Sequence, residues 1–411
     1  MGAPSKVIER NRTDIKGLEE DLARTESDLE AIRKKFADLI VASEEDLAIE
    51  VMKAETPLRI AASTNSFVMD GWLPTAKVEA LQASLNSLCC GLAFVETLPK
   101  EEGDEPPVLL KNPTPVKPFE FFMQLVRPPK YKEVDPSPLM AVFFPIFFGI
   151  MVGDVGYGLV IMALSLLVKA RSKAKWLQSL ANIMLISSVP TILFGLFFGE
   201  FFGDLGEHMH LMHPVELFGV TWNRMEAVIP MLILVIIIGA LHVFLGLGIG
   251  LYNAYTVRSR KHMIEKIGTA AVLIGLGLCL AGAAAFAPGL ALWAGLALLL
   301  VAIPMVFYGG GTSGVIELVS AVGNIMSYAR LMAIGMASVV LAIVANQFAG
   351  AIGVAVIGIA AALLLHALNV VLGMFSPSIH ALRLHMVEFF SKFYHGGGLL
   401  YKPFRKSEKE S

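Results

Sequence analysis

A single cation interrupts the apolar run NIMSYARLMAIGMASVV at residues 324–340. Arg330 keeps its charge at any physiological pH, and a charged side chain at the centre of a membrane helix costs at least about 2.5 to 3.5 kcal/mol. Such an arginine faces a partner or water. No acidic residue lies within 12 positions of it. We therefore expect its counter-charge on another protein; the alternative is a static pair with a neighbouring helix or a clamp on backbone carbonyls.

The surroundings of Arg330 are small side chains. Gly323, Ser327, Ala333 and Ala337 lie within two turns on the same side of the helix. A face of small residues lets helices pack closely. Because one long cationic side chain stands on this face, the face would also suit a neighbouring helix that moves past it. Arg330 cannot relay a proton, because its guanidinium is not deprotonated in proteins. Any conducted proton must travel on other groups.

Two groups of polar residues near Arg330 could carry that proton. Glu317, Ser320 and Asn324 share a helix face at spacings of three and seven, which could hydrate a proton path or simply mark a solvated helix end. In HALRLHMVEFF, His380 and Arg383 are three apart on one face. Histidine titrates near neutrality and burial raises the pKa of a carboxyl group, so such residues can pass protons.

The same stretch continues with His385 and Glu388, which we include as candidates, whereas Arg383 could also be a residue snorkelling at the helix end. Two further acids lie at helix ends: Asp154 in GDVGYG and Glu200 in FFGEFFGD. For these two acids, a role at a helix break or at the interface is as consistent with the sequence as proton conduction.

Metal and nucleotide chemistry are not indicated. The loop at 207–213 holds one glutamate and three histidines, but without the spacing of a tetrahedral site, so we predict no metal. No GxxxxGK[ST] motif occurs, and GGGTSG at 309–314 lacks the lysine. We expect no bound cofactor and no ATP hydrolysis by this chain alone.

The elements that hold these residues follow from composition. Hydrophobic residues make up 55% of the 411 residues and charged residues 17%. Residues 1–50 carry 21 Asp, Glu, Lys or Arg, whereas residues 318–379 carry only Arg330. This distribution predicts a soluble region followed by an integral membrane domain. The net charge of −2, without a basic stripe, argues against a nucleic-acid partner.

Residues 138–395 are predicted to form a mainly α membrane domain of eight helices. Residues 138–168 would be about 47 Å long as one helix, too long for one hydrocarbon core of about 30 Å and short for two full spans. We expect two short helices broken near Gly153 and Asp154. The other spans are predicted at 176–200, 227–252, 266–286, 289–308, 313–347 and 351–391, of which the last two are long enough to be tilted.

Loop charge orients this domain. KARSKAK at 169–175, TVRSRKHMIEK at 256–266 and the C-terminal tail at 396–411 are basic, while the loop from Glu200 to Glu216 is acidic and rich in histidine. The positive-inside rule places the basic loops in the cytoplasm. With eight spans, both chain ends are then cytoplasmic, in a multi-pass protein of the cell membrane.

The first 55 residues have the pattern of a coiled-coil strand. Apolar residues repeat every seven positions, and further apolar residues fill most of the intermediate positions. This seam consists of Ile8, Ile15, Leu22, Leu29 and Phe36 with Leu18, Ile32 and Leu39, interrupted by Asn11 and Thr25. One amphipathic helix on a globular domain is the alternative. In either case the seam needs a partner helix.

Between the predicted coiled coil and the membrane domain lie two further segments. Residues 56–98 predict a small α/β subdomain: FVMDGWLP as a strand with a turn, TAKVEALQASLNSL as a helix opened by a threonine cap, and LAFVETL as a second strand. Residues 99–137 are rich in proline at first and then aromatic and basic, which is typical of a linker and a segment at the membrane interface.

The ordered set FFPIFFGIMVGDVGYG, NIMSYARLMAIGMASVV and HALRLHMVEFFSKFYHGGGLLYKPF resembles the a subunit, or subunit I, of V-type and A-type rotary ATPases. The resemblance covers nearly the whole chain, including GWLP and the coiled coil. SYARLMAIG is closer to the archaeal and bacterial A-type branch than to eukaryotic relatives. Members of the family are longer, and the resemblance implies that the N-terminal part, with the second coiled-coil strand, is absent from this chain.

This resemblance implies a stator role in rotary ion translocation. The membrane domain would stand beside a rotating ring of proteolipid subunits and provide two offset half-channels, while its cytoplasmic part binds peripheral stalk subunits. Arg330 matches the essential arginine, which faces the ring carboxylates, and Arg383 matches the second arginine. Glu317 and His380 are similar in placement to half-channel residues. The ring decides whether the ion is H⁺ or Na⁺.

A transporter is the alternative from another class. A secondary transporter would use Arg330 to bind an anionic substrate near the bilayer midplane, but such folds often have repeated halves with broken helices, and the sequence contains no such repeat. A protein that is only a scaffold and translocates no ion would not account for a charged residue at position 330.

Overall fold

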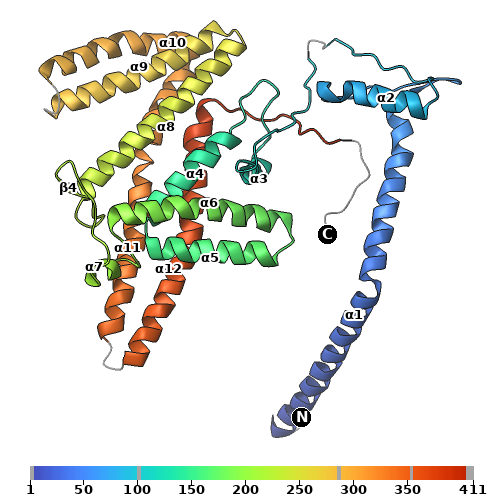
Figure 1. The fold of residues 1–411 in the computed structure, drawn as a ribbon, viewed down its shortest axis with the longest axis horizontal. Coiled ribbons are helices and arrows are strands. Elements are labelled where there is room, and N and C mark those ends of the chain that lie inside the picture. The colour runs from blue at the N-terminus through green and yellow to red at the C-terminus, as the bar shows by residue number, and fades with distance from the viewer. Residues whose placement is uncertain (1–3, 100–102, 285–287, 352–354, 404–411) are drawn as a thin grey trace. The chain divides into compact units, whose positions relative to one another are not determined.

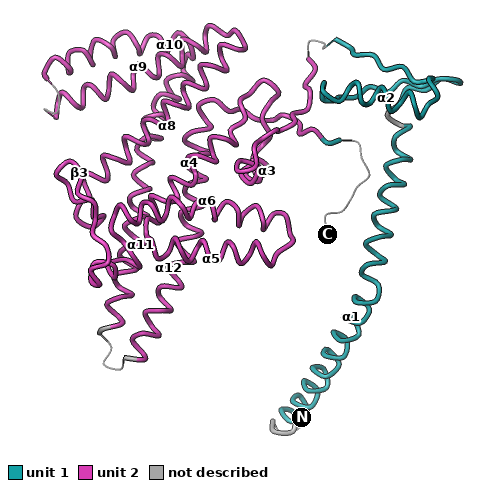
Figure 2. Tube along the Cα trace, viewed as in Figure 1, with its two compact units in different colours: residues 1–99, 402–411 teal, residues 100–401 magenta. Residues whose placement is uncertain are grey.

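The computed structural model describes residues 4–99, 103–284, 288–351 and 355–403. The chain divides into two compact units, residues 1–99 with 402–411 and residues 100–401 (Figure 2). Each unit is described by itself. Residues 404–411 of the predicted basic tail and residues 352–354 of the last predicted span lie outside the described residues.

The first unit begins with α1 (Pro4–Glu55), a single helix of 52 residues. All eight apolar residues of the seam named above are exposed, from Phe36 at 38% to Leu18 at 69%. An apolar stripe of this length requires a partner helix, because an isolated helix gains its stability in proteins by burying its apolar face. Among the described residues no helix covers it.

A short connection and a small helix complete the first unit. A 3₁₀ turn (Thr56–Arg59) leads to the antiparallel strands β1 (Ala61–Ala62) and β2 (Phe67–Val68). A second 3₁₀ turn (Thr75–Lys77) precedes α2 (Val78–Leu88), so the predicted threonine cap is not formed. Residues 92–98, predicted as a strand, are irregular.

The second unit is helical. Its N-terminal part holds a 3₁₀ turn (Lys117–Phe119) and α3 (Glu120–Leu125). Small strands β3 (Glu216–Leu217) and β4 (Val220–Thr221) form a hairpin, and α7 (Leu205–His208) precedes them. The longer helices are α4 (Ser137–Val152), α5 (Val155–Arg171), α6 (Lys175–Phe198), α8 (Val228–Thr256), α9 (Arg260–Ala283), α10 (Gly289–Met326), α11 (Ala329–Ala351) and α12 (Ala355–Arg383).

The predicted break near Gly153 and Asp154 is confirmed. Gly153 ends α4 with a φ of +41°, a conformation that glycine adopts readily. The carboxylate of Asp154 then caps α5 by accepting a hydrogen bond from Tyr157 N at 2.9 Å.

Five helical segments in the described part of the chain are long and apolar enough to cross a membrane: Lys175–Phe198, Val228–Thr256, Arg260–Ala283, Gly289–Ala349 and Val356–Lys392. The fourth contains 61 residues and bends at Gly311, whose φ of 59° and ψ of −140° are accessible essentially only to glycine. Its first half lies beside α9 (Figure 1). The fourth segment covers two of the predicted spans, 289–308 and 313–347, whereas the fifth, with 37 residues, is longer than one bilayer crossing requires, as predicted for the last span.

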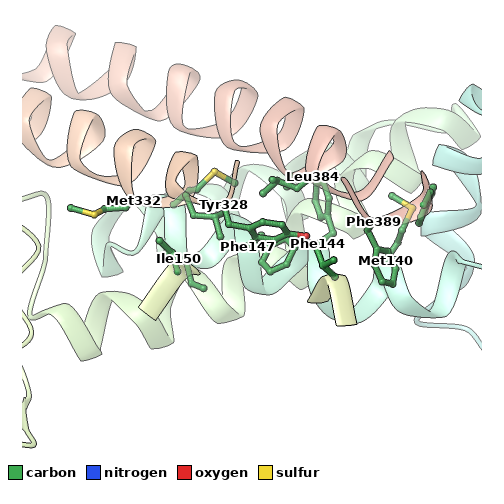
Figure 3. Close-up of a cluster of buried hydrophobic side chains, with 14 of the residues drawn as sticks. Met140, Phe144, Phe147, Ile150, Tyr328, Met332, Leu384 and Phe389 are labelled. Atoms are coloured by element: carbon green, nitrogen blue, oxygen red, sulfur yellow. The ribbon is translucent and has the colours of Figure 1, made fainter. Parts of the chain in front are cut away.

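The core of the second unit forms around α4. Aromatic side chains of α4 pack against Tyr328, at the junction of α10 and α11, and against Phe389 beyond α12 (Figure 3). The rings of Phe147 and Tyr328 meet edge to face at 5.7 Å. Since Tyr328 lies two positions before Arg330, this packing fixes the start of the helix that carries the cation.

The segment after α12 packs back on the residues before α4. The amides of His395 and Gly396 each donate to the carboxylate of Glu133 at 3.2 Å, and Tyr401 N donates to Val108 O at 2.9 Å. The described part of the predicted tail is therefore held against the unit up to Tyr401.

Candidate functional site

Arg330 lies in the first turn of α11, directly after the break at Ser327 and Tyr328. Its Nη1 is 3.7 Å from Oε1 of Glu388, with 21% of the arginine side chain and 2% of the glutamate side chain exposed. The expectation that the chain offers no counter-charge is therefore not met: Glu388 supplies one, 58 positions away in the sequence. The static alternative of a pair with a neighbouring helix describes this contact.

A wide helical turn carries Glu388. Residues Leu384–Phe389 (η4) form a π-helix between α12 and a 3₁₀ turn (Phe390–Lys392, η5). A π turn adds a residue to the helical repeat and so shifts the faces on which the following side chains lie; such turns occur frequently at functional sites. His385, in the same turn, lies against the rings of His242 and Phe147, each at 5.3 Å.

The predicted residue Glu317 finds a partner on α9. Lys266 Nζ lies 2.5 Å from Oε1 of Glu317, and both side chains are largely buried. Lys392, only 2% exposed, is close enough to both for their charges to act on it. Asn324 connects this pair to Lys392 in the turn after α12. In the amide orientation that gives both of its polar atoms a partner, the Asn324 side chain accepts a hydrogen bond from Lys392 Nζ at 3.2 Å and donates one to Ser320 O at 3.0 Å.

We call Arg330, Glu388, Asn324, Lys392, Glu317 and Lys266 the charged cluster. It holds three cations and two carboxylates, contributed by α9, α10, α11 and the turns after α12. Sequence reasoning missed Lys266 and Lys392, which look like ordinary members of a basic loop and of a helix end. Ser327, also a candidate, donates to Gly323 O at 3.0 Å.

His380 and Arg383 lie beside the charged cluster. His380 is one turn before Arg383 on α12 and within electrostatic reach of both Arg330 and Arg383. Its Nδ1 is buried without a hydrogen-bond partner among the described residues, as are Arg330 Nη1 and Glu388 Oε2. Arg330, Glu388, His380 and Arg383 thus lie close enough for their charges to act on one another.

Asp154 and Glu200 lie in a separate place, at the end of α4. Asp154 accepts hydrogen bonds from the amides of Phe202 and Gly203 at 3.1 and 2.7 Å. Glu200 forms a two-point ion pair with Arg224, whose Nε is 2.8 Å from Oε1. The same guanidinium donates to the last carbonyls of α4, at Met151, Val152 and Gly153. This arrangement caps a helix and joins two loops, which favours the structural alternative for both acids.

A second polar group connects α5, α11 and α12. We call it the neutral network, although one member is an acid: Asp204, Asn346, His366, Tyr157, Asn369 and Ser338. None of the six was a candidate from the sequence. The signal that could have found three of them is a polar side chain inside an apolar span, which applies to Asn346, His366 and Asn369.

Comparison with known proteins gives a consistent family. The sequence profile described as V-type ATPase 116 kDa subunit family matches residues 4–228 and 315–406. The A-type ATP synthase subunit I of Archaeoglobus fulgidus is 36% identical over 437 residues, covering 90% of this chain and 63% of that protein. The subunit I of Pyrococcus horikoshii is 31% identical, covering 100% and 64%. That of Methanocaldococcus jannaschii is 28% identical, covering 99% and 65%. The chain thus spans less than two thirds of the length of these relatives.

Proposed function

Because the chain belongs to the V-type ATPase 116 kDa subunit family, we propose that it acts as the membrane stator subunit of a rotary A/V-type ATPase. In this role it guides protons between the two sides of the membrane and the carboxylates of a rotating ring. ATP is made or hydrolysed on other subunits of the complex.

The pair of Arg330 and Glu388 is the observation that carries this proposal. Its separation of 3.7 Å exceeds the roughly 2.7 to 2.9 Å of a charge-assisted hydrogen bond. Glu388 is buried, while the arginine side chain remains 21% exposed. Glu388 therefore balances the charge of Arg330 within the chain, and the exposed part of the guanidinium can still bind a second carboxylate from another chain.

The mechanism follows from the charges. When a protonated ring carboxyl group reaches Arg330, the guanidinium favours its ionised form, so the O–H bond breaks and the proton passes to water or to a nearby base. Arg330 stays protonated throughout. When the ring carboxylate moves on, Glu388 again balances the cation, which lowers the free-energy cost of leaving a charge in the membrane. A fixed cation between two half-channels also repels a proton that would leak straight across.

The charged cluster belongs to the half-channel on the side of the basic loops. Lys266 is the last residue of the basic stretch 256–266, and these loops are placed in the cytoplasm by the positive-inside rule. Eight crossings are consistent with this placement: α4, α5, α6, α8, α9, the first half of α10 up to Gly311, the second half of α10 with α11, and α12. The seam of α1 would bind its partner helix and the peripheral stalk on the same side.

The test replaces Arg330 by Gln in the complete rotary complex, reconstituted in vesicles. Gln keeps hydrogen-bonding capacity but removes the charge, so we expect the complex to assemble while ATP-driven acidification of the vesicles falls to background. Arg171→Gln is the matched control, since Arg171 is an exposed arginine at the end of α5. This control should pump like the unaltered complex.

Two results would overturn the proposal. One is full proton pumping by an assembled Arg330→Gln complex. The other is uptake of an anionic solute by the isolated chain that disappears in the same variant, which would identify a transporter instead.

A further inference from the structure

We propose that the neutral network is the half-channel opposite the basic loops, with His366 as the group that takes up and releases the proton. This inference rests on the proposed stator function and specifies one of its two ion paths. The six side chains come from α5, α11, α12 and the loop before α7. Their hydrogen bonds in the described part of the chain join them to one another rather than to the charged cluster.

The hydrogen bonds of the network form one continuous chain. Ser338 Oγ donates to Asn369 Oδ1 at 3.3 Å, and Asn369 Nδ2 donates to Tyr157 Oη at 2.9 Å. Tyr157 Oη is 2.7 Å from His366 Nδ1, and His366 Nε2 is 3.0 Å from Asn346 Oδ1. Asn346 Nδ2 donates to Asp204 Oδ1 at 2.6 Å.

The direction of these bonds is determined by chemistry. An amide oxygen only accepts, so Nε2 of His366 must carry the hydrogen that lies toward Asn346. Nδ1 is then the acceptor and the hydroxyl of Tyr157 donates to it. From Asn369 to Asp204 every donor therefore points the same way, and the chain ends at a carboxylate, which only accepts when ionised.

Helices α11 and α12 form a hairpin (Figure 1). The spacing of the polar residues along α11 aligns the network with Arg330. Asn346 pairs with His366, and eight residues earlier on α11 Ser338 pairs with Asn369. Another eight residues earlier lies Arg330. At 1.5 Å per residue each interval is about 12 Å, so the network spans the outer part of the hairpin and ends two to three turns from the cation.

The far end of the network reaches water. The Asp204 side chain is 25% exposed and its Oδ2 lies 3.2 Å from Nε2 of His208, whose side chain is 74% exposed. Both belong to the loop between α6 and α8, on the opposite side of the membrane from the basic loops. His366 and Asn346 are half-buried, whereas Tyr157 and Asn369 are buried.

The proton step uses the two nitrogens of one imidazole. A proton from the Arg330 side bonds to Nδ1 as Tyr157 turns its hydroxyl away, and the ring becomes an imidazolium. The Nε2–H bond then breaks, and the proton passes through water held by Asn346 to the carboxylate of Asp204, leaving a neutral ring. Amides do not carry protons, so Asn346 and Asn369 bind and orient water instead. Histidine suits this step because its pKa lies near neutrality in water.

The first test is His366→Gln in the complete complex in vesicles. Gln retains hydrogen-bonding groups but cannot take up a proton. We expect normal assembly and a loss of ATP-driven acidification of about a hundredfold, the size typical for removal of a proton-transferring group. The control is His210→Gln, an exposed histidine of the same outer loop, which should pump normally.

The second test detects water access, which a purely structural hydrogen-bond network would not provide. In a chain whose native Cys89, Cys90 and Cys279 are replaced, Ser338→Cys should react with a small membrane-impermeant thiol reagent added on the side of the Asp204 loop. Ala342→Cys, one turn along the same helix at a position that is 0% exposed, should not react. Reaction of Ser338→Cys only from the basic-loop side would overturn the assignment.

The outcomes separate this inference from the proposed function. If Arg330→Gln stops pumping while His366→Gln pumps normally, the stator role stands and the assignment of this half-channel is wrong. If Arg330→Gln pumps normally, the proposed function itself fails. Loss of pumping in both variants, with the predicted labelling of Ser338→Cys, supports both.

Discussion

The charged cluster and the neutral network both include residues of α11 but differ in their chemistry. The charged cluster holds three cations and two carboxylates, with Arg330 and Glu388 at its centre. The neutral network holds one carboxylate, Asp204, at its exposed end and no permanent cation among its six residues. One region therefore holds fixed charges, which the proposed function would place beside the ring, and the other offers hydrogen bonds without fixed positive charge.

This difference indicates how a membrane protein can keep the barrier to proton leakage apart from the groups along which a proton could pass. Charges buried in a low dielectric are tolerated only in pairs, and a lone one has a large free-energy cost. Amides, hydroxyl groups and a neutral imidazole need only hydrogen-bond partners, which the network supplies to itself. Arg330 can repel a proton because it is permanently charged, whereas His366 can pass one because it is not.

The largest expected effect breaks the charged cluster at Glu317. Glu317→Gln leaves Lys266 and Lys392 without their carboxylate, and removing one partner of a buried ion pair costs about 3 to 5 kcal/mol. We expect a loss of this size in the free energy of unfolding, measured by thermal unfolding of the purified complex. Adding Lys266→Gln should restore most of it. A double variant no more stable than the single one would mean that the two groups are not coupled.

Glu388→Gln should have the next largest effect. It removes the internal counter-charge of Arg330, but this pair is 3.7 Å apart, against 2.5 Å for Lys266 and Glu317, so we expect a loss of about 3 kcal/mol, at the low end for such pairs. Thermal unfolding measures it, with the exposed acid Glu226→Gln as the control near zero. Equal stability of the two variants would show that Glu388 does not balance Arg330.

Tyr157→Phe tests the neutral network and should cost less. The change removes the hydroxyl group that joins His366 and Asn369, so Nδ1 of the half-buried His366 loses its partner, at about 1 to 3 kcal/mol, while Asn369 Nδ2 still donates to Ser338 O. Tyr252→Phe, at an exposed position, is the control. A loss of stability as large as that of Glu317→Gln would remove the distinction between the two regions.

The sequence was sufficient to find the cation and several of its neighbours. Arg330, Glu388 and Asn324 stood out because polar groups are rare in apolar helices, and the break at Gly153 followed from helix length alone. The pairing was not predictable. Glu388 reaches Arg330 through a π turn, and no residue pattern in LHMVEF distinguishes that turn from an ordinary α-helical one.

The neutral network was missed for a related reason. Its members are single polar residues on three helices and a loop, and Tyr157 lies 209 residues before His366. Each alone is consistent with a satisfied core residue or with a helix end. The members come together through the way α11 and α12 align along each other in the hairpin. That alignment depends on side-chain packing over many residues, such as the core around α4.

The smallest expected effect concerns Ser338, which ends the neutral network on the side of Arg330. Its hydroxyl makes a long bond of 3.3 Å to Asn369, and Asn369 still donates to the backbone carbonyl of residue 338 at 2.9 Å when the hydroxyl is removed. Ser338→Ala should therefore lower the free energy of unfolding by only about 0.5 kcal/mol, the low end for a neutral hydrogen bond. Ser187→Ala is the matched comparison, because the buried Ser187 hydroxyl has no hydrogen-bond partner among the described residues and its removal should be neutral or stabilising. Thermal unfolding of both variants measures the difference. A loss of several kcal/mol in Ser338→Ala would mean that this position holds the hairpin together, and the network would then have to be regarded as structural support at the point where it approaches Arg330.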